Sequence, residues 1–428
     1  MNLGKEPAPI GVRDFRLMAS SPHYIDKTGF IADICRRPGC VIAYHRPDGF
    51  GKSLALSMLE CFFSMDEDSR GYFKDKAIAK LNGGVCMQEM NAYPTIHLDL
   101  SALDAPSYPS MMEYVANMMA SVYEKANVLS FKSIWEYDRK EIKAILSKAA
   151  NEVELELSLQ RLSTYLKEET GKRAVILIDG YDTPAIAGAK HGYVKEAGGF
   201  FQAFFGAALK GNEAMERGVL VGVVPIIYAS DFSGFNNLIY RFGYDDIGEE
   251  RFGFTRKETM DYLRLYDKNF DEKMVQEWYG GYRLSNQGCF CPRSILAFAN
   301  GDFDYKTYKE SSSIDPLLLR NEDTAEVLQC VEGLISGKPT VCLTPTTIGP
   351  DSIAEQPRFR ELSLYSGYFT VDDIDTREYH LFTRIKIPNI ESRKALEKNV
   401  LGTLMITPQT ASKAKRQKPS SKATKKAA

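Results

Sequence analysis

The sequence lacks any uninterrupted apolar run close to the roughly 20 residues of a membrane-spanning helix. Its first residues, 1–9, are polar and charged, unlike a secretory signal peptide. The eight cysteines include no C-x-x-C pair with zinc-ligand spacing, so they predict reduced thiols and not a zinc site. Together these absences predict an intracellular protein, cytoplasmic or nuclear, without a membrane partner.

A strong excess of charge of one sign is also lacking. The net charge of −2 over 428 residues gives the whole chain no bias toward nucleic acid or membranes. One segment departs from this balance, because residues 411–428 carry basic side chains and no acidic ones: Lys413, Lys415, Arg416, Lys418, Lys422, Lys425 and Lys426. Residues 396–428 therefore predict a disordered basic tail. Two interpretations stay open: a segment for nuclear import or for a nucleic-acid or protein partner, and a solvated end without a function.

The remaining composition is that of a soluble globular protein, with 44% hydrophobic and 26% charged residues. Apolar runs rich in β-branched residues predict four buried parallel strands at Val41–Tyr44, Thr95–Leu100, Ala174–Ile178 and Val219–Ile227. Helical patterns accompany them at Ser53–Phe63, Ser110–Lys125, Val153–Glu168 and Tyr193–Leu209. This alternation predicts an α/β domain with a parallel sheet flanked by helices, over residues 5–253.

After residue 253 the strand signal fades, and we expect a smaller, mostly helical C-terminal lid domain at residues 254–395. Thr255 and Glu258 have the spacing of a capping box at a helix start. Further elements are predicted as helices at Lys273–Tyr279 and Pro316–Gly333, and as a short strand at Tyr365–Val371.

The strongest local motif is Asp48-Gly49-Phe50-Gly51-Lys52-Ser53, between the first predicted strand and the first predicted helix. This context is typical of a phosphate-binding loop, whose backbone N–H groups and helix N-terminus face phosphate oxygens. We expect Lys52 to reach the β- and γ-phosphates and the Ser53 hydroxyl to ligate Mg²⁺. The residues expected to hold the nucleotide are Gly49, Phe50, Gly51, Lys52, Ser53 and Leu54. The common pattern has glycine where this chain has Arg46, so an ordinary glycine-rich turn with an exposed lysine is the alternative.

A second motif supports the first. The apolar strand Ala174–Ile178 is followed by Asp179. In a parallel sheet, this places the carboxylate at the edge where the phosphate loop lies. Asp179 is therefore the second expected Mg²⁺ ligand, beside Ser53.

Several ordered phrases make the chain resemble the AAA-ATPase-like family, P-loop NTPases that usually carry a PD-(D/E)XK nuclease-like domain at the C-terminus. The family's opening phrases P-I-G-x-x-D-F and Y-x-D-K-T-x-F-I match Pro9–Phe15 and Tyr24–Ile31. Its phosphate loop R-P-R-R-F-G-K-[ST] matches Arg46–Ser53, so the missing first glycine is normal for the family. Later matches are Asp179–Pro184, Phe232–Asn237, Phe252–Thr255, Trp278–Arg283, Ser366–Thr370 and Ile387–Asn389.

This chain differs from the family at positions that are expected to take part in hydrolysis and phosphate binding. Gly180 replaces the glutamate that orients the attacking water, and Pro225 stands where a sensor arginine is expected. Asp48 and Gly49 replace two loop arginines, and Asp48 would repel phosphate unless it points away. General-base assistance and a charge-stabilising arginine are worth about 10²–10⁴ and 10³–10⁵ in rate, respectively. Asp182 could substitute as a base; the alternative is that it caps the following loop.

The resemblance implies ATP as the ligand with Mg²⁺ as its companion, and Lys52 and Asp179 as catalytic residues with Asp182 as a candidate. Three interpretations stay open: a slow ATPase, a catalytically inactive nucleotide switch or scaffold, and a degenerate structural paralogue. The family's nuclease domain would follow Ile387–Asn389. The 39 residues after Asn389 contain no Asp and Glu-x-Lys strand pair, so nuclease activity is not expected. No trans-acting arginine is identified, and no oligomeric state is predicted.

Overall fold

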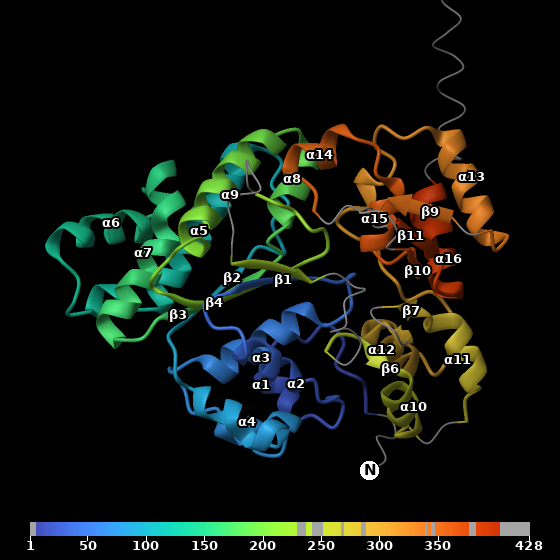
Figure 1. Cartoon of the computed structure of the whole chain (residues 1–428), viewed down its shortest axis with the longest axis horizontal. Helices are drawn as coiled ribbons and strands as arrows, with labels where there is room; N and C mark the ends of the chain where they lie inside the picture. The colour runs from blue at the N-terminus through green and yellow to red at the C-terminus, as the bar shows by residue number, and fades with distance from the viewer. Residues whose placement is uncertain are drawn as a thin grey trace, which may run out of the picture.

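A computed structural model of the chain is shown in Figure 1. It describes residues 6–228, 237–241, 251–266, 269–283, 288–338, 340–343, 347–375 and 382–402. The basic segment 411–428 and most of the phrase Phe232–Asn237 lie outside the described residues.

The centre of the fold is a five-stranded sheet in which every neighbouring pair is parallel. In the order β2-β3-β4-β1-β5, its strands are Thr95–Asp99, Ala174–Asp179, Met215–Gly222, Val41–His45 and Leu238–Arg241. The four predicted strands are confirmed, although β4 ends at Gly222 and not at Ile227. The strand β5 was not expected, because its residues are only half-buried and end in an arginine, so they lack the continuous apolar run of a buried strand.

Helices cover both faces of this sheet, as Figure 1 shows. On one face lie α1, α2, α3 and α4 with the 3₁₀ segments η1 and η2: Phe15–Ala19, Gly29–Cys35, Lys52–Phe63, Arg70–Phe73, Ala77–Ala79 and Leu81–Glu89. On the other lie α5, η3, α6, α7, α8 and α9: Tyr108–Lys125, Val128–Ser130, Glu136–Leu146, Glu152–Thr170, Thr183–His191 and Val194–Leu209. Strand residues alternate between the two cores, as the pleat requires: Ile42 and Tyr44 enter the first, and Val41 and Ala43 the second. The predicted α/β fold with a helix-flanked parallel sheet is confirmed.

The C-terminal part combines helices with two small antiparallel sheets. The first sheet, β6-β8-β7, packs with three helices; in chain order these elements are β6 Phe254–Thr255, α10 Arg256–Arg264, α11 Glu272–Tyr279, β7 Tyr282–Arg283, β8 Gly288–Phe290 and α12 Pro292–Asn300. The second, β10-β11-β9, lies among η4 Asp315–Leu317, α13 Thr324–Ile335, β9 Thr340–Leu343, α14 Pro350–Glu355, α15 Phe359–Tyr365, β10 Thr370–Asp375, β11 Phe382–Lys386, α16 Ile390–Leu396 and η6 Glu397–Leu401.

The expected capping box at the start of α10 is present, with Thr255 and Glu258 bonded reciprocally, and the predicted helix at Lys273–Tyr279 is confirmed as α11. The helix predicted over Pro316–Gly333 is wrong in its first half, since α13 begins after the cap residue Asp323. The strand predicted over Tyr365–Val371 begins only at Thr370. The chain first turns at Gly367, whose φ of +75° ends the helical run.

The apolar cores join the two parts of the chain. Side chains from residues 314–401 belong to the same buried cluster as those of α8 and α9, and α14 lies beside these helices in Figure 1. Residues 254–303 form most of a separate cluster around Tyr279 and Phe298. The domain boundary near residue 253 stays a prediction.

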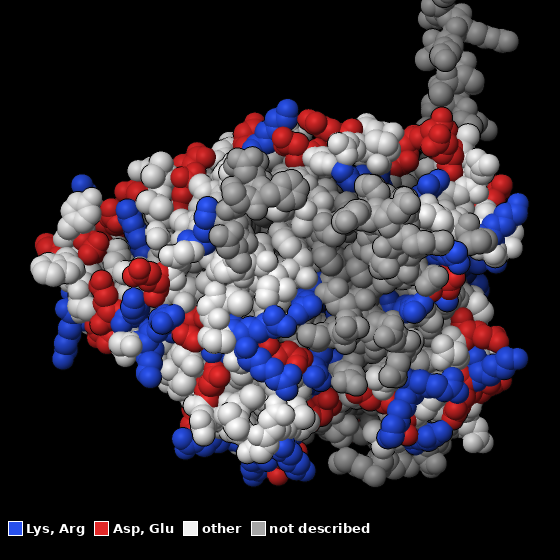
Figure 2. Space-filling model, viewed as in Figure 1, with Lys and Arg blue, Asp and Glu red and all other residues white. Residues whose placement is uncertain are grey.

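Among the described residues, no helix has the length and apolar character needed to cross a bilayer. Figure 2 shows basic and acidic side chains intermingled over the visible face, as the small net charge suggests.

Candidate functional site

The predicted phosphate loop joins the buried central strand β1 to the N-terminus of α3. Two glycines make its turn, since Gly49 and Gly51 have φ values of +86° and +81°, in the left-handed region that favours glycine. At Gly49 a side chain would also collide, because a Cβ atom would lie 2.9 Å from the Cys291 sulfur and 3.0 Å from the Arg293 Cβ. At Gly51 no atom lies within 4 Å of such a Cβ, so the backbone there borders open space.

Residues of the C-terminal part support this loop from one side. Phe50 is buried and packs edge-to-face on Tyr282, with ring centroids 5.2 Å apart. The Arg293 backbone N–H donates to the Gly49 carbonyl oxygen at 3.3 Å. The Ser312 hydroxyl donates to Asp48 Oδ2 at 2.7 Å. The position of the loop therefore depends on residues more than 200 positions away in the sequence.

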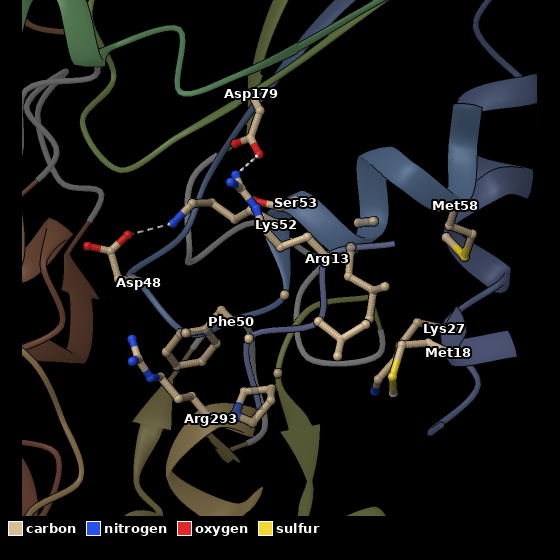
Figure 3. Close-up of a pocket in the computed structure, with 18 of the residues that line it drawn as sticks. Arg13, Met18, Lys27, Asp48, Phe50, Lys52, Ser53, Met58, Asp179 and Arg293 are labelled. Atoms are coloured by element: carbon tan, nitrogen blue, oxygen red, sulfur yellow. Dashed lines mark hydrogen bonds and ion pairs between the residues drawn. The ribbon is translucent and has the colours of Figure 1, made fainter. Parts of the chain in front are cut away.

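The Lys52 ammonium folds back over the loop. Its Nζ donates to the carbonyl oxygens of Arg46 at 2.8 Å and Pro47 at 3.1 Å, and pairs with Asp48 Oδ1 at 3.2 Å (Figure 3). Burial opposes ionisation of Asp48, but the Lys52 charge and the Ser312 hydroxyl outweigh it and hold the pKa of Asp48 below its ordinary value. The ionised Asp48 carboxylate therefore pairs with Lys52, the lysine that is expected to bind phosphate.

Ser53 and Asp179 meet at the guanidinium of Arg13. A single nitrogen, Nη2, lies 2.9 Å from Ser53 Oγ, 2.8 Å from Ser101 Oγ and 2.8 Å from Asp179 Oδ2 (Figure 3). The other terminal nitrogen, Nη1, lies 3.2 Å from Asp99 Oδ2. The Asp179 side chain is only 4% exposed, so this ion pair supplies the charge partner that a buried carboxylate requires.

The oxygens around Arg13 suit a divalent cation in kind. A serine hydroxyl and carboxylates are the hard ligands that Mg²⁺ prefers, and Mg²⁺ usually takes only one or two protein carboxylates beside phosphates and water. No cluster of three or more His, Cys, Asp or Glu with metal-ligand geometry occurs in the described ranges. Ser53 and Asp179 therefore fit the expected ion chemically, at a point where this structure has a guanidinium nitrogen.

Asp182 was expected either to act as a base or to cap the following loop, and the segment that follows it is the helix α8. It is the N-cap residue of α8, but its side chain makes no capping bond there. Its Oδ2 accepts the backbone N–H groups of Val223 at 2.8 Å and Val224 at 2.7 Å, just after β4. Burial raises the pKa of Asp182 to about 6, against the lowering effect of these two N–H groups. This bonding ties β4 to the start of α8.

The backbone conformation and the close neighbours of position 180 require glycine, independently of any chemical role. Its φ is +67°, and a Cβ atom would lie 2.6 Å from the Ser101 Cα and 2.7 Å from the Ser101 backbone nitrogen. A glutamate cannot occupy this position unless the strand ends move apart.

Two further positions were singled out in the sequence: Arg46, where the common phosphate-loop pattern has glycine, and Pro225, where a sensor arginine was expected. Arg46 is buried, donates to the His45 carbonyl oxygen at 2.8 Å, and has its guanidinium 5.2 Å from the Phe252 ring centroid. Pro225 follows β4 and is not among the residues that line the pocket described next.

A pocket of about 440 Å³ opens beside the loop, and the site residues expected from the sequence, Gly49 to Leu54, Asp179 and Asp182, all contribute to its wall. Its charged lining has a basic excess: Arg13, Lys27, Lys52, Arg251 and Arg293 against Asp48, Asp179 and Asp182. Apolar side chains such as Met18 and Met58 line the part farther from the loop (Figure 3). Lys27 lies beside Met18 in this part, so cationic and apolar side chains share the wall (Figure 3). A pocket of this size and lining suits a ligand with an anionic group and an apolar group.

Three residues of this site were not foreseen from the sequence: Arg13, Asp99 and Ser101. Asp99 could have been found, because β2 ends in a carboxylate just as β3 does, and the register pairs Asp99 with Asp179. For Arg13 the sequence held no signal beyond its place in the opening phrase, since its contact with Asp179 spans 166 positions.

Compared with known proteins, residues 9–232 match the AAA-ATPase-like family, described as predicted AAA-ATPase. No curated protein and no solved structure gives a match. The matched segment covers more than half of the 428 residues and contains the predicted phosphate loop, Asp179 and four of the five strands of the central sheet, β1 to β4. The five-stranded parallel sheet with helices on both faces agrees with a P-loop NTPase-like fold. The chain therefore belongs to the AAA-ATPase-like family.

Proposed function

We propose that the chain binds a nucleoside triphosphate, with ATP as the candidate, at the loop from Gly49 to Leu54. The observation that carries this proposal is the joint position of Lys52, Ser53 and Asp179 on the wall of one pocket at the carboxyl edge of the sheet. The Lys52 ammonium and the Arg13 guanidinium on this wall suit the phosphates, and the apolar side chains of Met18 and Met58 suit a base. When Mg²⁺ accompanies the nucleotide, Ser53 and Asp179 are its proposed ligands, and it would neutralise phosphate charge.

We further propose that hydrolysis is slow. The position after Asp179 is a glycine that cannot accept a proton, and Asp182 has one carboxylate oxygen bonded to two backbone N–H groups. Without a base, a loss of about 10²–10⁴ in rate is expected. Lys52 and Asp179 stay as the proposed catalytic residues, with Asp182 a weaker candidate because of its bonds.

The alternative is a catalytically inactive nucleotide switch. Contacts between the loop and the C-terminal part favour it, since Asp48 bonds to Ser312 and Phe50 packs on Tyr282. A triphosphate that takes Lys52 away from Asp48 would alter the first of these contacts. Nucleotide binding would then change the contacts of Tyr282 and Ser312 without any turnover.

Calorimetric titration with ATP and Mg²⁺ tests the proposal on the wild type, Lys52→Ala and the matched control Lys195→Ala, whose lysine is exposed and pairs with Glu355. We expect binding by the wild type and the control, and a loss of at least about tenfold in affinity for Lys52→Ala, the size of a charge-assisted hydrogen bond. A wild type that ignores triphosphates would refute the function. Single-turnover hydrolysis then separates the slow ATPase from the inactive switch.

A further inference from the structure

The Arg13 guanidinium lies among the same oxygens that would hold a divalent cation. Its Nη2 has three oxygen neighbours within 2.9 Å, from Ser53, Ser101 and Asp179. Asp99, at the end of the neighbouring strand, faces the adjacent nitrogen. An arginine side chain is protonated at every physiological pH, so this position holds a permanent positive charge.

The residues that follow Arg13 are held in place by hydrogen bonds and buried packing, and they position its guanidinium. Asp14 caps α1 by accepting the Arg16 backbone N–H at 2.9 Å. Phe15 is completely buried and stacks on Phe73 with ring centroids 5.0 Å apart. The Phe15 backbone N–H donates to Ser57 Oγ on α3 at 2.9 Å, which ties the segment to the same helix that carries Lys52 and Ser53.

Charge balance favours keeping Arg13 in place. The nearly buried Asp179 carboxylate needs a cation, because an unpaired charge at that depth is costly. In P-loop proteins the metal ion beside the loop serine bridges the β- and γ-phosphate oxygens. A guanidinium held against Ser53 Oγ therefore faces the place where those oxygens are expected, and its planar set of N–H donors suits phosphate.

From these observations we propose that Arg13 is the counter-cation of the bound triphosphate, so that this chain holds a nucleoside triphosphate without requiring Mg²⁺. The inference rests on the proposed function and adds the metal-free nucleotide as a ligand of the same site. Mg²⁺ and Arg13 are then alternative occupants of one oxygen-lined position. Removal of the guanidinium makes the site dependent on the metal.

The test measures ATP affinity calorimetrically in excess EDTA and in excess Mg²⁺ for the wild type and Arg13→Gln. The matched control is Arg16→Gln, which removes the same charge three residues away, where Arg16 pairs with Glu67 and Asp14. For the wild type and for the control, we expect the ATP affinity in EDTA to lie within about threefold of the affinity in Mg²⁺. For Arg13→Gln we expect a loss of about tenfold or more in EDTA, the size of a charge-assisted hydrogen bond, and recovery in Mg²⁺.

A second measurement follows the thermal midpoint with Mg²⁺ alone. In Arg13→Gln the carboxylates of Asp99 and Asp179 lose their cation, so Mg²⁺ should raise the midpoint of this variant and leave the wild type unchanged. If the Gln variant does not fold, Arg13→Lys keeps the charge but loses the fork of donors, and an intermediate metal dependence is expected.

The outcomes separate this inference from the function on which it rests. ATP binding by the wild type only with Mg²⁺, or equal binding by Arg13→Gln in both conditions, would overturn the role of Arg13 and leave triphosphate binding intact. Failure of the wild type to bind ATP in either condition would remove the proposed function and this inference together.

Discussion

Replacing Asp48 with asparagine should tighten triphosphate binding. In the structure, the Asp48 carboxylate pairs with Lys52 Nζ at 3.2 Å and accepts the Ser312 hydroxyl. A phosphate that uses Lys52 must compete with this ion pair. Asparagine keeps the shape of the side chain and an oxygen for Ser312 but removes the competing charge.

The size of the effect follows from the geometry of the pair. At 3.2 Å, two unit charges attract by roughly 1 kcal/mol in water and about 5 kcal/mol at an effective dielectric constant of 20. The Asp48 side chain is 47% exposed, so the lower end applies, in line with about 1 kcal/mol or less for exposed pairs. We therefore expect the ATP affinity of Asp48→Asn to rise about fivefold.

Calorimetric titration of ATP at fixed ionic strength would measure this change. Asp68→Asn is a suitable control, since Asp68 is exposed, pairs only loosely with Arg70 at 3.8 Å, and carries the same charge. Unchanged or weaker binding by Asp48→Asn, with a normal control, would refute the competition and would mean that Asp48 orients Lys52 for its ligand.

Three further changes test the scaffold of the site. Gly180→Glu should lower the free energy of unfolding by about 2–3 kcal/mol because of its positive φ and the close Ser101 backbone, and it should not speed single-turnover hydrolysis; faster turnover in a stable variant would contradict this. Asp182→Asn should remove one pH-dependent contribution to stability: burial raises the pKa of Asp182 to about 6, so the stabilisation from its protonation is fully present below about pH 4 and is lost, by on the order of 2–3 kcal/mol, as the pH rises through about 6. Thermal midpoints of the two proteins should differ in slope between these pH values, and parallel curves would refute the assignment. Phe50→Ala should cost about 3 kcal/mol in chemical denaturation, because this side chain is 2% exposed and packs on Tyr282; a loss below 1 kcal/mol would show that the loop does not depend on this packing.

Gly180 differs from the family pattern for a reason that the sequence does not reveal. In the sequence, Gly180 is seen only as a replacement of the family's glutamate. In the fold, the backbone at this position has a left-handed conformation and lies against Ser101, which only glycine allows without rearrangement. The loss of the glutamate can be inferred from position 180 alone. Whether a glutamate can be put back depends on the space between the ends of β2 and β3.

The sequence by itself determined four of the five strands of the sheet, its flanking helices and the glycine-containing turn between β1 and α3 that we propose binds phosphate. Strands such as β1 and β3 are continuous buried apolar runs, and their signal is local because both faces of a parallel sheet are covered. The shared position of Lys52, Ser53 and Asp179, our proposed site, was predicted by the same local reasoning, because strand ends in parallel sheets meet at one edge. The short elements of the C-terminal part were less predictable, because strands of two or three residues carry no periodicity.

Only the tertiary structure decided what surrounds these residues. The partners of Lys52, Asp48 and Asp182 depend on which carbonyl, hydroxyl or N–H group the fold brings near, and no spacing rule encodes them. Arg13 reaches Asp179 across 166 positions, through a buried anchor at Phe15. Local periodicity reports which face of an element is buried, whereas a contact between distant side chains exists only after the chain has packed.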